Sequence, residues 1–255
     1  MTRSDRRPRQ RLDPAQRRTA ILDAARDAFA QAPYDQVSLA SVASAADASE
    51  ALVHKYFATK GALYAEIVRE AIESLLQRQF EADAALGPGA TARQRLATSV
   101  EAYLDFVAST PEGWAAPLRD PCDGAAEAAS LRAAARERYV TLLRAVLGLP
   151  PGQPRDHALH GYLGFLDAAC LSWVTAGCPR DQRPALTAAA LGALDGALAA
   201  LPPETATASR HPEMPGQGRE TGRTVSMTAP AGPVRGLFRL RPWPARPRNP
   251  GRTDA

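Results

Sequence analysis

The stretch of residues 49–60 concentrates side chains that can contact an anion or the edge of a nucleotide base. The chain has 31 lysine and arginine residues, and its only two lysines, Lys55 and Lys60, both lie in this stretch. Glu50 can accept a hydrogen bond from a cytosine amine, and Leu52 can contact a thymine methyl group. Because ammonium groups bind phosphate oxygens, this combination is typical of a segment that contacts duplex DNA. The alternative is that both lysines simply lie on a solvated face.

Two short helices joined by a tight turn would present this segment. Ser38 and Ser49 are residues of the type that caps the start of a helix. Val53 and Phe57 are four residues apart and would therefore lie on the same, inward face of the second helix. This pattern predicts a helix-turn-helix at about residues 38–57, with backbone amides at the helix starts directed at phosphates.

Residues 17–67 resemble the DNA-binding domain of the tetracycline-repressor (TetR) family. The resemblance rests on Ile21-Leu22-Asp23-Ala24-Ala25, on Tyr34 in the following turn, on His54-Lys55-Tyr56-Phe57, and on Lys60 at the start of the next helix. It implies an all-α fold with an N-terminal three-helix helix-turn-helix domain and a C-terminal helical domain for ligand binding and dimerisation. It also implies a repressor that binds a palindromic operator as a dimer and is released by a small effector. The rest of the chain matches the family only in the order and length of its helices.

Three positions depart from the family pattern. Pro33 and Asp47 stand where glycine is usual, and His54 stands where a phosphate-binding tyrosine is usual. Aspartate tolerates the left-handed backbone region better than most residues, so the turn remains feasible. Because imidazole changes charge near neutral pH, we expect operator affinity to depend more on pH than in a His54→Tyr variant, which tests this expectation. The DNA-contacting residues that we expect are Arg17, Arg18, Ser38, Ser49, Glu50, Ala51, Leu52, His54, Lys55, Tyr56, Thr59 and Lys60.

Positive charge is concentrated at the two ends of the chain. Residues 1–18 carry seven arginines and two aspartates, and residues 201–255 carry nine arginines and four acidic residues. Since the whole chain has a net charge of +4, the part between these ends is acidic. A basic arm beside a DNA-contacting segment suits a phosphate backbone. For the C-terminal end we prefer a solvated, disordered tail.

The remaining sequence predicts a helical body. Hydrophobic residues make up 45% of the chain, alanine and leucine are abundant, and β-branched residues are sparse. Besides a first helix starting at Asp13-Pro14, we expect helices at about 59–85, 91–109, 125–147, 155–175 and 184–200, and a broken helical piece at 111–121. The expected domains are a disordered basic arm at 1–12, a DNA-binding domain at 13–60, an effector-binding and dimerisation domain at 61–201, and a disordered Pro/Arg-rich tail at 202–255.

Two further sets of residues follow from the helical pattern and from the resemblance. Aromatic and leucine side chains that could surround an apolar or aromatic effector are Tyr103, Phe106, Trp114, Leu118, Tyr139, Leu143, Tyr162 and Phe165, although such stripes also form ordinary core. The last two helices would form a four-helix dimer interface through Leu166, Cys170, Trp173, Leu191, Leu194 and Leu198.

Other chemistry is less well supported by the sequence. Asp156, His157 and His160 lack a convincing further metal ligand, so we expect no metal site. The three cysteines form no CxxC pair, and Cys122 alone lies in an expected loop, where a redox sensor remains an alternative to core packing.

The sequence also bears on the class of protein and on its location. The chain has no P-loop and no GxSxG motif, so we expect neither an enzyme nor a cofactor, although a helical enzyme or stress protein without DNA binding remains a second hypothesis. Activation, or regulation without a ligand, is a third. We expect a cytoplasmic location, because the number of cysteines is odd and argues against a set of disulfides, and because we find no signal peptide and no long apolar run.

Overall fold

The computed structural model of the chain describes residues 13–119 and 125–201, and every regular element within these ranges is a helix. The helices are α1 (Pro14–Gln31), η1 (Tyr34–Gln36), α2 (Leu39–Ala45), α3 (Glu50–Tyr56), α4 (Lys60–Leu86), α5 (Ala92–Ser109), α6 (Pro111–Arg119), α7 (Ala126–Leu147), α8 (Gln153–Thr175), η3 (Arg180–Gln182) and α9 (Arg183–Ala199). The all-α fold class is therefore confirmed. The arm and tail expected at 1–12 and 202–255, like Cys122, lie outside the described residues.

Side-chain caps explain where five of the helices begin. Asp13, Ser38, Ser49, Thr59 and Thr91 each accept a hydrogen bond from the amide three residues further on, at 2.8 to 3.2 Å. Each cap satisfies an amide that has no partner within the helix, and typically stabilises the helix by about 1 kcal/mol. The helix starts predicted at Asp13, Ser38, Ser49 and Thr59 are confirmed.

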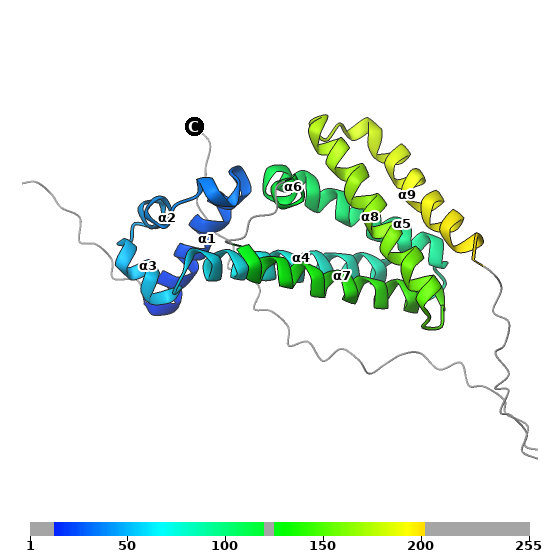
Figure 1. The fold of residues 1–255 in the computed structure, drawn as a ribbon, viewed down its shortest axis with the longest axis horizontal. Helices are drawn as coiled ribbons and strands as arrows, with labels where there is room; N and C mark the ends of the chain where they lie inside the picture. Colours follow the sequence, from blue (N-terminus) through cyan, green and yellow to red (C-terminus); the bar gives the residue numbers. More distant parts are fainter. Residues whose placement is uncertain (1–12, 120–124, 202–255) are drawn as a thin grey trace, which may run out of the picture. The chain divides into compact units, whose positions relative to one another are not determined.

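Buried apolar side chains form two clusters along the chain. The first joins α1 to α4 and includes Ala125 and Ala128 near the start of α7, whereas the second joins α5 to α9. Figure 1 shows α1, α2 and α3 gathered at one end of α4, with α7 beside α4 and α9 beside α8. The helix α4 thus contacts the first cluster at its start and packs against α5 and α7 further along. Within the described ranges, no helix has the length and apolar character needed to cross a membrane.

The helix α6 approaches the end of α1 closely at Gly113. A Cβ atom placed on Gly113 would lie 2.7 Å from the carbonyl oxygen of Phe29 and 3.1 Å from the Cα atom of Ala30. Both are backbone atoms, which cannot move aside as a flexible side chain can. The absence of a side chain at Gly113 therefore allows α6 to pack directly on α1.

We predict that Gly113→Ala lowers the free energy of unfolding by about 1–3 kcal/mol, because the added methyl group forces the two helices apart. Alanine is otherwise the better helix former by about 1 kcal/mol, so the sign of the change tests the close contact. Urea unfolding measures it. Gly89→Ala is the control, since no atom lies within 4 Å of the added Cβ there. A Gly113→Ala protein as stable as the wild type would contradict this packing.

Candidate nucleic-acid interface

The helices α2 and α3 form the predicted helix-turn-helix, and burial fixes which face of α3 is exposed. Val42 of α2 and Val53 of α3 are fully buried in the first apolar cluster. With Val53 turned inward, α3 exposes the side chains of Glu50, Ala51, His54 and Lys55, whereas Leu52 and Tyr56 are half-buried. The exposed face thus combines one small residue with one acceptor and two possible donors, which suits close contact with base edges and phosphates.

The turn between α2 and α3 has the conformation expected for it. Asp47 adopts a φ of 46°, in the left-handed region where glycine is favoured, and the amide of Ala48 donates to the carbonyl of Ala43 at 2.9 Å. Arg17 of α1 donates through one guanidinium nitrogen to the carbonyl oxygens of Ala46, at 3.2 Å, and of Asp47, at 3.1 Å. The arginine that we expected to bind DNA therefore holds the turn.

Two other cations of the predicted DNA-contacting set lie against neighbouring helices. Arg18 donates to the carboxylate of Glu66 in α4 at 2.7 Å. Lys60, the first residue of α4, places its ammonium group 4.2 Å from the centre of the Tyr34 ring and 3.5 Å from the carbonyl oxygen of Asp35. Both side chains remain partly exposed, but their contacts tie α1 and η1 to α4.

Lys55 differs from these three cations. Its side chain is exposed on α3 and makes no hydrogen bond or ion pair with any residue that the structure describes. On the same helix, Glu50 and His54 lie four residues apart, with 4.0 Å between a Glu50 carboxylate oxygen and His54 Nε2. His54 Nδ1 lies 3.4 Å from the carbonyl oxygen of Ala58, which leaves Nε2 directed toward Glu50 and solvent.

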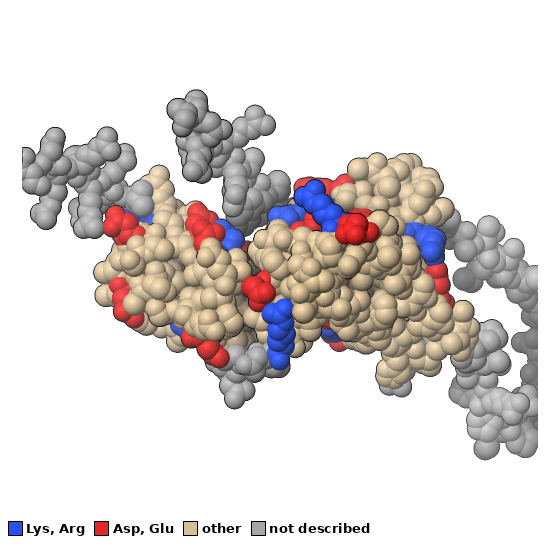
Figure 2. Space-filling model, turned by 90° about the horizontal axis from the view of Figure 1, so that it is seen from above, with Lys and Arg blue, Asp and Glu red and all other residues tan. Residues whose placement is uncertain are grey.

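Charge alone does not single out a surface on the face shown in Figure 2. Acidic and basic side chains alternate there, and broad areas carry neither kind. The helix-turn-helix is therefore recognised by its geometry and by the free ammonium group of Lys55 rather than by a continuous basic patch on that face. The remaining predicted contact residues that are exposed are Ser38, Ser49 and Thr59, each of which caps a helix.

The aromatic residues predicted to surround an effector do not meet around one cavity. Trp114 of α6 donates through Nε1 to the hydroxyl oxygen of Tyr103 at 3.0 Å, and that hydroxyl donates to Asp167 of α8 at 3.1 Å. Arg136 of α7 also pairs with Asp167. Burial raises the pKa of Tyr103 well above its ordinary value, with the Asp167 carboxylate as a further cause. These side chains form a polar link between four helices. Of the other predicted residues, Tyr162 is buried in the second cluster, Phe106 packs on it half-buried, and Leu118 and Phe165 are exposed.

A cavity of about 100 Å³ lies instead between α4, α5 and α7, and two predicted effector residues, Tyr139 and Leu143, line it. Its polar side is occupied by Gln79, which donates to Ser99 Oγ at 2.9 Å and accepts from the Tyr139 hydroxyl at 2.8 Å. The sequence reasoning missed Gln79 and Ser99. The observation that could have identified them is that both are polar residues next to apolar positions of predicted helices. The rest of the wall includes the ion pair of Asp83 and Arg95, at 2.6 Å, and the apolar side chains of Leu76, Phe80, Leu96, Leu142 and Val146.

The residues predicted for the dimer interface lie inside the single chain. Leu166, Cys170, Trp173, Leu191 and Leu194 are buried in the second cluster, and Leu198 packs against it. Apolar periodicity identified the buried faces of α8 and α9, and those faces pack within the same chain. The opposite faces of α8 and α9 remain open, and the exposed residues of α8 there include Gly161, Gly164, Phe165, Ala168 and Ser172.

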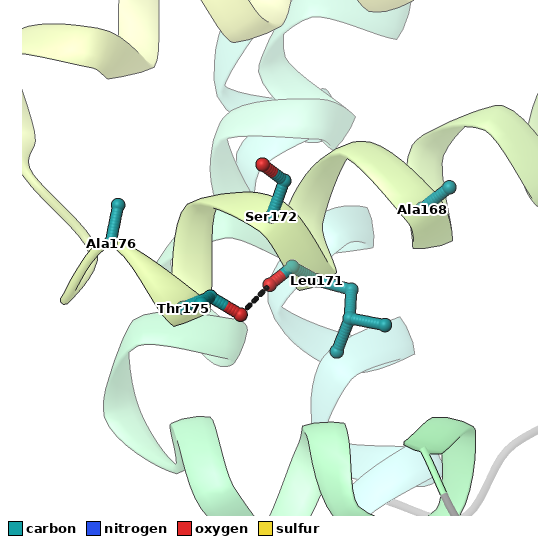
Figure 3. A pocket seen from close by; sticks show the side chains of 5 residues that line it. All are labelled: Ala168, Leu171, Ser172, Thr175 and Ala176. Carbon is teal, nitrogen blue, oxygen red and sulfur yellow. Dashed lines mark hydrogen bonds between the residues drawn. The ribbon is translucent and has the colours of Figure 1, made fainter.

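The exposed face of α8 has a shallow hollow near its C-terminal end. Ala168, Leu171, Ser172, Thr175 and Ala176 line it, and Thr175 donates back to the carbonyl of Leu171 at 2.9 Å (Figure 3). None of these side chains carries a charge. On α9 the exposed Asp195 pairs with Arg93 of α5.

The candidate metal residues form ordinary ion pairs, and the redox candidate Cys122 lies outside the described residues. Asp156 pairs with Arg144 at 3.3 Å, and His160 lies 3.5 Å from Glu137. Within residues 13–119 and 125–201, no three His, Cys, Asp or Glu side chains come together as a metal site would require. Burial, with the nearby Asp167 as a further cause, raises the pKa of Cys170 to about 12, which disfavours the reactive thiolate.

Comparison with known proteins gives a match to the segment that contains the helix-turn-helix. The family model described as "Bacterial regulatory proteins, tetR family" matches residues 21–67. The HTH-type transcriptional activator FasR of Mycolicibacterium smegmatis is 28% identical over 104 residues, which are 41% of this chain and 46% of that protein. The match therefore spans about half the length of this curated relative.

Solved structures extend the similarity of fold to most of the chain. A tetR-family transcriptional regulator from Streptomyces coelicolor has a TM-score of 0.64 at 23% identity, over 74% of this chain and 84% of that one. A TetR-like transcriptional regulator from Rhodococcus sp. RHA1 has a TM-score of 0.56 at 25% identity, over 75% of this chain and all of that one. The helix-turn-helix at α2 and α3 lies inside the segment that matches the TetR family of bacterial regulatory proteins, and the chain shares its fold with regulators described as TetR-like.

Proposed function

We propose that the chain is a transcriptional regulator that binds a palindromic operator as a dimer and releases it when a small apolar or aromatic effector binds. The observation that carries the proposal is α3, whose inward Val53 leaves Glu50, Ala51, His54 and Lys55 exposed on one helix. A helix with such a face can enter the major groove and contact both bases and phosphates.

Selection of bound fragments from a random DNA pool tests this function, and we expect a palindromic sequence to be enriched. On that sequence, Lys55→Ala should weaken binding and lower the slope of log affinity against log salt by about one, because one phosphate contact is lost. Arg93→Ala on α5 is the control and should leave the slope unchanged. Failure to enrich any palindrome would contradict the proposal.

Dimerisation through the outer faces of α8 and α9 is supported by what those faces expose. On α9 the exposed residues include Ala188, Ala189, Gly192 and Gly196, which allow close approach of a second helix, and no heavy atom lies within 4 Å of a Cβ placed on Gly192 or Gly196. Phe165 of α8 remains 39% exposed in the single chain. A second copy would cover these apolar side chains and bring two α3 helices to one palindrome.

Ala168→Arg on the exposed face of α8 should convert the dimer to a monomer, because the interface would have to bury an unpaired charge. Light scattering at micromolar concentration measures the mass, and operator binding should weaken when the dimer is lost. Ala133→Arg on the exposed side of α7 is the matched control and should remain dimeric. A wild-type monomer that binds its operator as a monomer would refute this part of the proposal.

The cavity between α4, α5 and α7 is the proposed effector site. Its mostly apolar wall supports an apolar or aromatic ligand. Its volume of about 100 Å³ is smaller than the roughly 150 Å³ of a cavity that binds benzene in another protein, so a ligand of that size has to widen it. The cavity includes Leu76 of α4, and the same helix begins at Lys60 beside the helix-turn-helix. A ligand that favours another angle of α4 would therefore change the spacing of the two α3 helices.

We expect benzene or toluene to raise the thermal unfolding temperature of the wild type and to weaken operator binding. Val146→Phe should remove both effects, because the larger ring fills the cavity from a partly exposed position. The variant should keep its operator affinity in the absence of ligand, which controls for damage to the fold. Equal responses of the two proteins would exclude this cavity as the effector site.

Activation is a second form of the same function, and it is favoured by the curated relative, which is an activator. The direction of regulation follows from where the operator lies relative to the promoter, which the protein itself does not determine. A reporter gene behind the selected operator, with and without the regulator, distinguishes repression from activation.

A further inference from the structure

We propose that Arg17 is a positioning residue for α3 and that it does not neutralise a DNA phosphate. This inference rests on the proposed DNA-binding function. Its guanidinium group donates to the carbonyl oxygens of Ala46 and Asp47, at 3.2 and 3.1 Å, and those two residues form the turn from α2 into α3. The contact spans 29 and 30 residues of sequence, so it joins α1 directly to the turn.

The turn needs such support for two physical reasons. Asp47 has a φ of 46°, which a residue with a Cβ atom rarely adopts. Ala46 is the C-terminal cap of α2, so its carbonyl oxygen lies where a helix has acceptors without partners and a partial negative charge. A cationic donor that serves both carbonyls satisfies these acceptors and favours the left-handed conformation of Asp47.

The helix α1 is a rigid anchor for this contact. Ile21 and Leu22 are buried in the first cluster, one turn after Arg17. Arg18 pairs with Glu66 at 2.7 Å, and Arg26 pairs with Glu70 at 2.6 Å, so α1 is tied to α4 along its length. Since α3 begins three residues after Asp47, the direction of α3 depends on a turn that Arg17 links to this anchor.

Lys55 provides the contrast that makes the assignment testable. Its ammonium group has no partner among the described residues and is free to bind a phosphate, whereas one nitrogen of the Arg17 guanidinium group is directed at two backbone oxygens of the turn. Loss of a phosphate contact lowers the salt dependence of binding, whereas loss of a positioning contact weakens binding at every salt concentration alike. The two roles therefore differ in slope, even where the loss of affinity is the same.

The test compares the wild type, Arg17→Ala, Asp47→Gly, the double variant and Lys55→Ala on the selected operator across a range of salt. We expect Arg17→Ala to lose about tenfold in affinity with an unchanged slope, since hydrogen bonds from a charged donor are lost. Glycine adopts the left-handed conformation unaided. In the Asp47→Gly background, Arg17→Ala should therefore lower operator affinity only about twofold. A slope lowered by about one, or an equal loss in both backgrounds, would overturn the proposal.

Hydrogen exchange of the free protein gives a readout that needs no DNA. In Arg17→Ala the amides of Asp47 and Ala48, which close the turn, should exchange faster, and Asp47→Gly should reduce the difference. Arg17→Lys, which keeps a terminal donor at a similar reach, should exchange at a rate between those of the wild type and Arg17→Ala, and it serves if Arg17→Ala fails to fold. Unchanged exchange at the turn would overturn the role of Arg17, whereas a wild type that selects no operator would overturn the DNA-binding function alone.

Discussion

Four fully buried side chains, one from each of the first four α-helices, hold the candidate interface together: Ile21, Val42, Val53 and Leu63. Complete burial of a side chain of this size typically stabilises a fold by about 1.5–3 kcal/mol. Because Val53 must point into this cluster, the opposite face of α3 must be exposed. The residues available for contact with DNA therefore follow from packing inside the protein.

Polar contacts then refine what the apolar cluster determines. Arg17, Arg18 and Lys60 each bind a group on a neighbouring helix or turn, and they orient the helix-turn-helix on α4. Lys55 is left with a free ammonium group on the exposed face of α3. Among residues 13–119 and 125–201, the cations of the predicted interface thus divide into three that build it and Lys55, which is free to meet a phosphate.

The success of sequence reasoning depended on the range of the interactions. Caps such as Ser38 and Ser49 act over three residues, so the helix starts and the helix-turn-helix could be predicted. The partners of Arg17 lie about thirty residues away, and no local pattern reveals them. Similarly, the apolar stripes of α8 and α9 identified buried faces such as that of Leu194, but periodicity does not tell whether the same chain or a second copy covers a face.

The central claim is that the exposed face of α3 lies against DNA, and hydrogen exchange with and without the selected operator tests it most directly. When the operator binds, exchange of the backbone amides should slow most across Ser49 to Tyr56 and at the capped starts of α2 and α4. The amides on the outer face of α9 should exchange at an unchanged rate. Slower exchange confined to the body, with α3 unchanged, would contradict the account.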